Sequence, residues 1–141
     1  VDCYISTLIP QDYVEDIFLR LEIYNDISNA KNDYDIDHIV SKLEDVYGPI
    51  PDYLKNLFSL TRVKIEGNRI KADKIKINKE NTVITLNPKS LIDNDKLINH
   101  FVLKNKIKLI DQYNLKYQNI SKDNFCELCE EVISMMKDIS D

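Results

Sequence analysis

One stretch near the start of the chain, from Ile9 to Ala30, constrains the fold more than any other. At the helical step of about 100° per residue, its apolar side chains fall on two nearly opposite sides. One side carries Val14, Ile17, Phe18, Leu21 and Tyr24, and the other carries Leu19, Ile23, Ile27 and Ala30. A surface helix normally has a single apolar stripe. We therefore expect a central helix that is sandwiched between other elements.

Polar residues predict how this helix starts. Asp12 is followed three positions later by Glu15, the spacing of a capping box, in which each side chain accepts a hydrogen bond from a free backbone N–H. Asp16 and Arg20 lie four residues apart, so an ion pair between them would stabilise the helix locally. We expect the helix to start near Asp12.

The remaining apolar patterns predict an alternation of strands and helices. Strands are indicated at residues 1–8, 74–78 and 82–86, and residues 107–109 and 113–117 are interpreted as two more strands or one broken strand. Further helices are indicated from a cap at Asp35 to Tyr47, from Pro51 to about Ile70, from about Asp93 to Val102, and from a cap at Ser121 to Met136. The order is β-α-α-α-β-β-α-β-β-α. Because the strands come mostly as adjacent hairpins, we expect an α+β fold with helices packed on a largely antiparallel sheet.

Length and composition indicate a single globular domain. The 141 residues suffice for one core, and the contents of 43% hydrophobic and 30% charged residues are ordinary for a soluble protein. No apolar run approaches the roughly 20 residues that span a bilayer. Three cysteines without a secretory leader favour a reducing cytoplasm. Since the chain starts with Val1 rather than Met, we expect residues 1–141 to be one domain of a longer protein.

Motifs for nucleotide chemistry are absent from the sequence. A phosphate-binding loop needs several glycines together with Lys and Ser or Thr, whereas Gly48 and Gly67 are the only glycines. His38 and His100 have no partners in a Ser/His/Asp or Cys/His pattern, so they are interpreted as packed or surface histidines. We expect no catalytic residue and no cofactor in this domain.

Cys126 and Cys129 form the one conspicuous short motif. A structural zinc site needs four ligands, and the two histidines are far away in sequence. A redox pair should open a helix after a strand, but this pair falls inside an amphipathic helix. Packing of both thiols as small hydrophobic groups is favoured, with metal or redox chemistry as the alternative.

Residues 62–76 are locally basic. Their cations are Arg62, Lys64, Arg69, Lys71, Lys74 and Lys76. The net charge of −5 argues against a bulk polyanion as partner, because nucleic-acid-binding domains usually carry a basic surplus. The segment is interpreted as a solvated helix end followed by an edge strand with protective lysines. A nucleic-acid-contacting module that uses segment 62–76 is the alternative function.

A longer pattern resembles one known family. It consists of Ile9-Pro10, Asp12-Tyr13-Val14, Asp16, Arg20-Leu21, Tyr24, Ile27-Ser28 and Ala30, followed by Leu43, Asp45, Tyr47-Gly48, Pro51 and Asn56-Leu57. These residues are similar to the first half of the C-terminal (TRCF) domain of the bacterial transcription-repair coupling factor. Lys71 stands where that family typically has a helix-ending glycine.

The resemblance implies a regulatory C-terminal domain that is not itself an enzyme. The parent protein of this family is a cytoplasmic, ATP- and Mg-dependent DNA translocase that displaces stalled RNA polymerase and recruits the damage-recognition subunit of nucleotide-excision repair. The implied direct partner is the N-terminal repair-factor-binding domain of the same chain, which the C-terminal domain masks. RNA polymerase, the repair subunit and DNA are implied only as partners of the parent, and no membrane is implied.

The resemblance also implies which residues make the interdomain contact. The charged positions of the family before its Tyr/Phe-Gly turn correspond to Lys42, Asp45 and Val46. Lys42 stands where relatives often have Glu, and Val46 stands where Arg is usual. Only Asp45 is retained, so we expect a docking contact here with an altered charge pattern.

Overall fold

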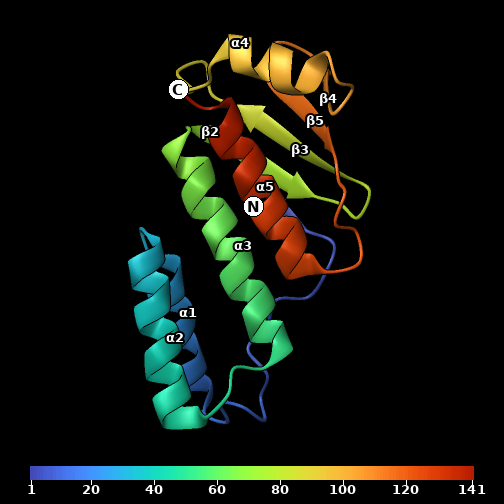
Figure 1. Cartoon of the computed structure of the whole chain (residues 1–141). Coiled ribbons are helices and arrows are strands. Elements are labelled where there is room, and N and C mark those ends of the chain that lie inside the picture. Colours follow the sequence, from blue (N-terminus) through green and yellow to red (C-terminus); the bar gives the residue numbers. More distant parts are fainter.

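The computed structural model describes residues 1–141 as helices packed on a five-stranded sheet (Figure 1). The helices are α1 Ile17–Ser28, α2 Asp33–Tyr47, α3 Asp52–Arg69, α4 Asn94–Leu97 and α5 Phe125–Ile139, with a π-helical turn η1 at Ile98–Val102 directly after α4. The strands are β1 Asp2–Cys3, β2 Ala72–Ile77, β3 Asn81–Leu86, β4 Ile107–Leu109 and β5 Asn114–Gln118. The predicted order of elements and the α+β class are confirmed.

The sheet has the strand order β1-β2-β3-β5-β4. Only β1 runs parallel to its neighbour, and all other pairs are antiparallel, so the prediction of a largely antiparallel sheet is confirmed. Strand β1 is much shorter than the predicted strand at residues 1–8. Cys3 already pairs with Ile77, the last residue of β2, so the chain beyond Cys3 has no strand left to pair with.

Two hydrophobic cores share one helix. The larger core has 18 buried residues and lies between the sheet, α3, α5 and the α4–η1 segment. The smaller core has nine and lies among α1, α2, the first half of α3 and the loops beside them. Helix α3 contributes Leu54 and Phe58 to the smaller core and Val63 to the larger one. Figure 1 shows the consequence: the α1–α2 hairpin lies against one end of α3, away from the sheet.

Helix α1 begins at Ile17 and not near Asp12, so the predicted capping box is wrong. The carbonyl of Pro10 accepts hydrogen bonds from the N–H groups of Tyr13 (3.1 Å) and Val14 (3.2 Å), which holds the chain in a turn before the helix. Asp16 then caps α1, because its carboxylate accepts the N–H of Phe18 at 2.7 Å.

The predicted ion pair between Asp16 and Arg20 is also not formed. Arg20 Nη1 instead donates to the backbone carbonyls of Val14 (2.7 Å) and Glu15 (2.8 Å). The guanidinium therefore ties the start of α1 to the turn that precedes it, while the Asp16 carboxylate is occupied by backbone donors.

Each of the two predicted apolar stripes is buried only in part, so the prediction of a sandwiched helix is wrong. Ile23 and Ile27 pack in the smaller core. Ile17, Phe18 and Leu21 are 56%, 77% and 57% exposed. The reason is the position of α1 at the edge of the molecule, where α2 and α3 pack against one side and no element covers the other. We call Ile17, Phe18 and Leu21 the free stripe.

Asparagine side chains replace two of the predicted helix caps. Asn32 caps α2 by accepting the N–H of Asp35 at 2.9 Å, and Asn124 caps α5 by accepting the N–H of Glu127 at 3.0 Å. Asp35 and Ser121, which were predicted to cap, lie inside α2 and before α5, respectively.

Candidate functional site

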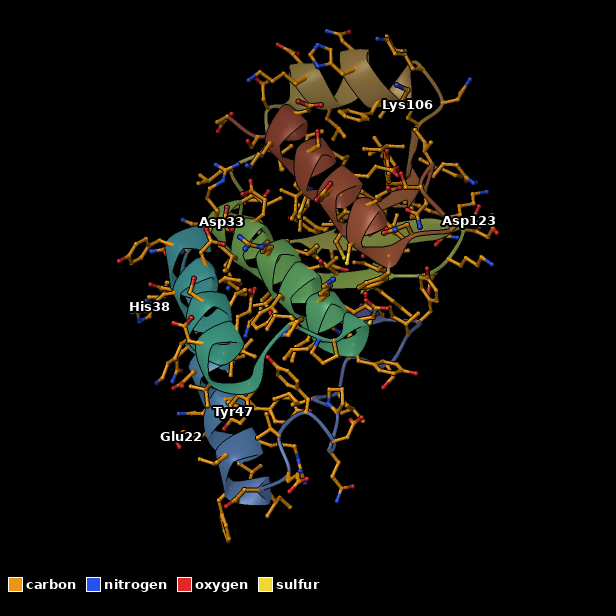
Figure 2. The ribbon with its side chains drawn as sticks, turned by 60° about the horizontal axis from the view of Figure 1, so that its bottom comes forward. Glu22, Asp33, His38, Tyr47, Lys106 and Asp123 are labelled. Carbon is orange, nitrogen blue, oxygen red and sulfur yellow. The ribbon has the colours of Figure 1, made fainter.

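A groove of about 350 Å³ lies between α1 and α2, and no residue of α3 lines it. Its lining contains Leu19, Ile23, Ala30, Ile39, Leu43, Val46 and Tyr47 as apolar residues and Glu22, Asp26, Asn29, Asp35, His38 and Lys42 as polar ones. Figure 2 shows Glu22 and His38 on the outer side of this hairpin, with Tyr47 at the end of α2. The groove is therefore an apolar strip with a polar rim, in which three carboxylates accompany one lysine.

Two of the three predicted contact residues line this groove. Lys42 and Val46 lie four residues apart and share one side of α2. Val46 is 65% exposed although it is apolar. Asp45 is also exposed and lies in the last turn of α2, but it does not line the groove. All three side chains are thus available for contact with another surface.

The charge at the end of α2 is unfavourable for the helix itself. Glu44 and Asp45 lie in its last turn, which contains no basic residue. The C-terminal end of a helix carries partial negative charge, so carboxylates there are destabilising. Helix stability therefore does not explain Asp45.

Residues of the family-like pattern hold the hairpin in place. Tyr13 Oη donates to the carbonyl of Gly48 at 2.8 Å and lies 3.3 Å from that of Leu43, so it satisfies the free end of α2. The rings of Tyr13 and Tyr47 are 5.6 Å apart. Burial and then the nearby Glu44 raise the pKa of Tyr13, which keeps its hydroxyl a donor. Gly48 has a φ of 89°, a conformation that favours glycine.

The basic segment 62–76 does not form one surface. Arg62 donates to Asp33 (2.9 Å) and Asp37 (2.6 Å), which joins α3 to α2. Arg69 donates from Nε to Glu66 at 2.8 Å within α3. The later lysines of the segment lie on β2, a separate element. Two of its six cations are therefore occupied by carboxylates of the chain itself.

Of the cysteine pair, only Cys129 occupies the core position that the sequence favours for both. Cys129 is buried in the larger core, and burial raises its pKa. Cys126 is half-buried, with Sγ 3.5 Å from Asn56 Oδ1. No group of three or more His, Cys, Asp or Glu side chains is arranged to hold a metal ion. No helix has the length and apolar character to cross a membrane.

The two histidines are exposed and lie far from each other. His38 stacks on Tyr34 with ring centroids 6.4 Å apart on the outside of α2, and His100 lies on η1. Neither is joined by a hydrogen bond to a serine, a cysteine or a carboxylate.

Comparison with known proteins gives consistent matches. The family model described as the TRCF domain matches residues 3–97. The transcription-repair-coupling factor of Buchnera aphidicola subsp. Acyrthosiphon pisum (strain APS) is 27% identical over 140 residues, which cover 99% of this chain and 17% of that protein. The one of Myxococcus xanthus is 32% identical over 90 residues, 64% of this chain and 8% of that protein. The chain thus spans less than a fifth of these relatives.

A solved structure has the same fold. The crystal structure described as the C-terminal domain of transcription-repair coupling factor superimposes with a TM-score of 0.76. The match covers 96% of this chain and 94% of the other, at 17% sequence identity. The structural similarity therefore extends beyond residues 3–97 of the family model to β4, β5 and α5.

Proposed function

Because the chain belongs to the TRCF domain family, we propose that it is a regulatory C-terminal domain that docks on another domain of the same polypeptide. The parent is then an ATP- and Mg-dependent DNA translocase of the cytoplasm that acts on stalled RNA polymerase. The docked partner is its N-terminal repair-factor-binding domain, and docking keeps the damage-recognition subunit of nucleotide-excision repair from binding there. The domain itself has no catalytic role and no cofactor.

The observation that carries this proposal is the uncovered apolar surface of the α1–α2 hairpin. Phe18 and Leu21 of the free stripe and Val46 at the groove are each more than half exposed. Full burial of one such side chain is worth about 1.5 to 3 kcal/mol. Phe18 and Leu21 belong to the free stripe of α1, and Val46 belongs to the groove lining on α2. Exposed large apolar side chains beside polar residues are typical of surfaces that contact another protein.

Masking requires a contact of limited strength. The domain must occupy the partner surface in the resting protein and leave it when the motor engages, so the two states must differ by only a few kcal/mol. Two or three apolar side chains, with Lys42 and Asp45 fixing the orientation, supply an interaction of this size. A much larger apolar interface would hold the domain in place permanently.

We expect Asp45→Ala in the full-length protein to increase binding of the repair subunit. A charge at the edge of an interface is worth up to about 1 kcal/mol, so affinity should rise about two- to fivefold. Val46→Glu, which places a charge on the apolar surface itself, should have a larger effect. Binding is measured by titrating the labelled repair subunit into each variant.

The matched controls lie away from the hairpin. Asp138→Ala removes an exposed carboxylate from α5, and Leu103→Glu adds a charge at an apolar position that is 70% exposed after η1. Both should leave the affinity unchanged. Unaltered binding after Val46→Glu would refute docking through this surface, whereas unaltered binding after Asp45→Ala alone would remove only that contact.

A further inference from the structure

The outer face of the sheet carries a row of lysines. Side chains alternate along each strand, and Ile75, Ile77, Leu115 and Tyr117 point into the larger core. The intervening residues Lys74 and Lys76 of β2, Lys116 of β5 and Lys108 of β4 are all exposed on the opposite face. Figure 1 shows α3 and α5 packed on the core side of this sheet.

The strand register aligns three of these lysines. Lys76 pairs with Val83, Val83 pairs with Lys116, and Lys116 pairs with Lys108. Since neighbouring strands are about 4.8 Å apart, this row extends about 14 Å across β2, β3, β5 and β4. Lys74 lies two residues from Lys76 on the same face. We call Lys74, Lys76, Lys108 and Lys116 the lysine face.

The fold does not explain this charge. Lysines on an edge strand protect it from pairing with other chains, and this accounts for Lys108 on β4. Lys76 and Lys116, however, lie on interior strands, between β1 and β3 and between β3 and β4. Like charges directly opposite each other, as at Lys108 and Lys116, are destabilising. None of the four lysines forms an ion pair with a carboxylate of the chain.

Charge is also segregated along the sequence. Residues 71–122, which contain β2 to β5, include eleven lysines and only five carboxylates. The chain as a whole has a net charge of −5. The acidic surplus therefore lies outside residues 71–122, and the sheet region is positively charged within an acidic protein.

We propose that the lysine face binds the phosphate backbone of duplex DNA without reading its sequence. Lysine ammonium groups interact with phosphates as point charges, whereas base recognition relies on planar side chains such as Arg, Asn or Gln that reach into a groove. Proteins that bind single strands stack the bases on aromatic side chains. The exposed face of the strands offers Val83 and Thr85 between the lysines and no aromatic residue, which favours a duplex.

This surface is separate from the docking surface on the α1–α2 hairpin. It includes Lys74 and Lys76 of the basic segment 62–76, but not Arg62 and Arg69, which are bonded to carboxylates within the chain. The two proposals can therefore fail independently of each other.

The test is binding of the 141-residue chain to a fluorescein-labelled duplex of arbitrary sequence, followed by anisotropy between about 50 and about 200 mM salt. The variant Lys76→Gln/Lys108→Gln/Lys116→Gln should bind at least about tenfold more weakly at the lower salt concentration. Each phosphate contact contributes about 0.9 to the slope of log affinity against log salt, so the slope should fall by about 2 to 3.

Two further variants separate position from total charge. Lys31→Gln/Lys55→Gln/Lys137→Gln removes the same charge from exposed lysines outside the lysine face and should change affinity less than about twofold. Lys76→Arg/Lys108→Arg/Lys116→Arg keeps the charge and should retain binding. The circular dichroism spectrum and melting temperature of each variant show that it is folded.

Three outcomes would overturn the proposal. The first is no measurable duplex binding by the unmodified chain at about 50 mM salt. The second is equal loss in the two glutamine variants, which would make net charge rather than the lysine face responsible. The third is stronger binding to polyglutamate than to the duplex, which would assign the surface to an acidic protein partner.

Discussion

The Glu131 carboxylate of α5 accepts hydrogen bonds from three residues of β5 and the loop that follows it. It accepts the Tyr117 hydroxyl at 2.6 Å and the N–H groups of Ile120 (2.9 Å) and Ser121 (2.7 Å). Burial opposes its ionisation, but these donors outweigh burial and lower the pKa of Glu131. Burial and the bond to Glu131 raise the pKa of Tyr117. The ionised carboxylate thus fixes the loop between β5 and α5.

A pH dependence of stability follows from this lowered pKa. The bonds of ionised Glu131 stabilise the fold above its unfolded-state pKa of about 4.3, and this contribution is lost as the pH falls through the lower folded-state pKa. We expect Glu131→Gln to reduce the free energy of unfolding by about 1.5 to 3 kcal/mol near pH 7. The difference should shrink towards about pH 3, as measured by urea denaturation at each pH.

Glu130 provides the control for this measurement. It is the adjacent residue of α5 and its side chain is exposed, so Glu130→Gln should change stability by less than about 0.5 kcal/mol at any pH. A constant difference between Glu131→Gln and the unmodified chain over the whole pH range would contradict the role of ionised Glu131.

At the scale of elements, α1 shows which structural features a sequence pattern can predict. Periodicity identified the helix and both of its apolar stripes, but it does not tell which stripe another element covers. The sequence does not predict the start of α1, because the carbonyl of Pro10 accepts the N–H groups of Tyr13 and Val14 and holds them in a turn. It does not predict the caps at Asn32 and Asn124 either, because several polar residues near the start of α2 and of α5 can serve as a cap. Lys71 stands where the family typically has a helix-ending glycine, and it follows α3 with a φ of 62°, in the left-handed region that favours glycine.

The candidate surfaces were predictable only in part. The position of Lys42, Asp45 and Val46 in the last turns of α2 followed from sequence, but the groove depends on how α1 lies against α2. The lysine face depends on the strand order β3-β5-β4, which places Lys108 and Lys116 side by side. It also depends on the register, since a one-residue shift of β5 would turn Lys116 towards the core. Neither the packing angle of two helices nor the register of distant strands is encoded in a local pattern.

The two stripes of α1 should respond oppositely to truncation. Ile27→Ala removes a side chain that is 3% exposed and should destabilise the chain by about 2 to 5 kcal/mol. Phe18→Ala, on the free stripe, should change the free energy of unfolding by less than about 0.5 kcal/mol. Chemical denaturation of both variants measures this. A large loss for Phe18→Ala would mean that the free stripe is covered within the chain.

At the scale of the whole molecule, the two cores differ in size, with 18 buried residues in one and nine in the other. Segments with fewer buried apolar contacts open at lower free energy than the main core. We expect backbone amides of α1 and α2 to exchange with deuterium before those of β3, β5 and α5. Native-state hydrogen exchange measured by mass spectrometry tests this, and simultaneous exchange of both groups would show that the cores open together.

The sharing of α3 between both cores has a mechanical consequence. Its 18 residues form a rod about 27 Å long, at 1.5 Å per residue. Leu54 anchors one end beneath the hairpin, and Val63 and Ile70 anchor the other against the sheet. A force applied to the α1–α2 hairpin would be transmitted to the sheet as a rigid-body tilt of α3. Binding of a partner to the α1–α2 hairpin would thus displace the sheet without unfolding any element.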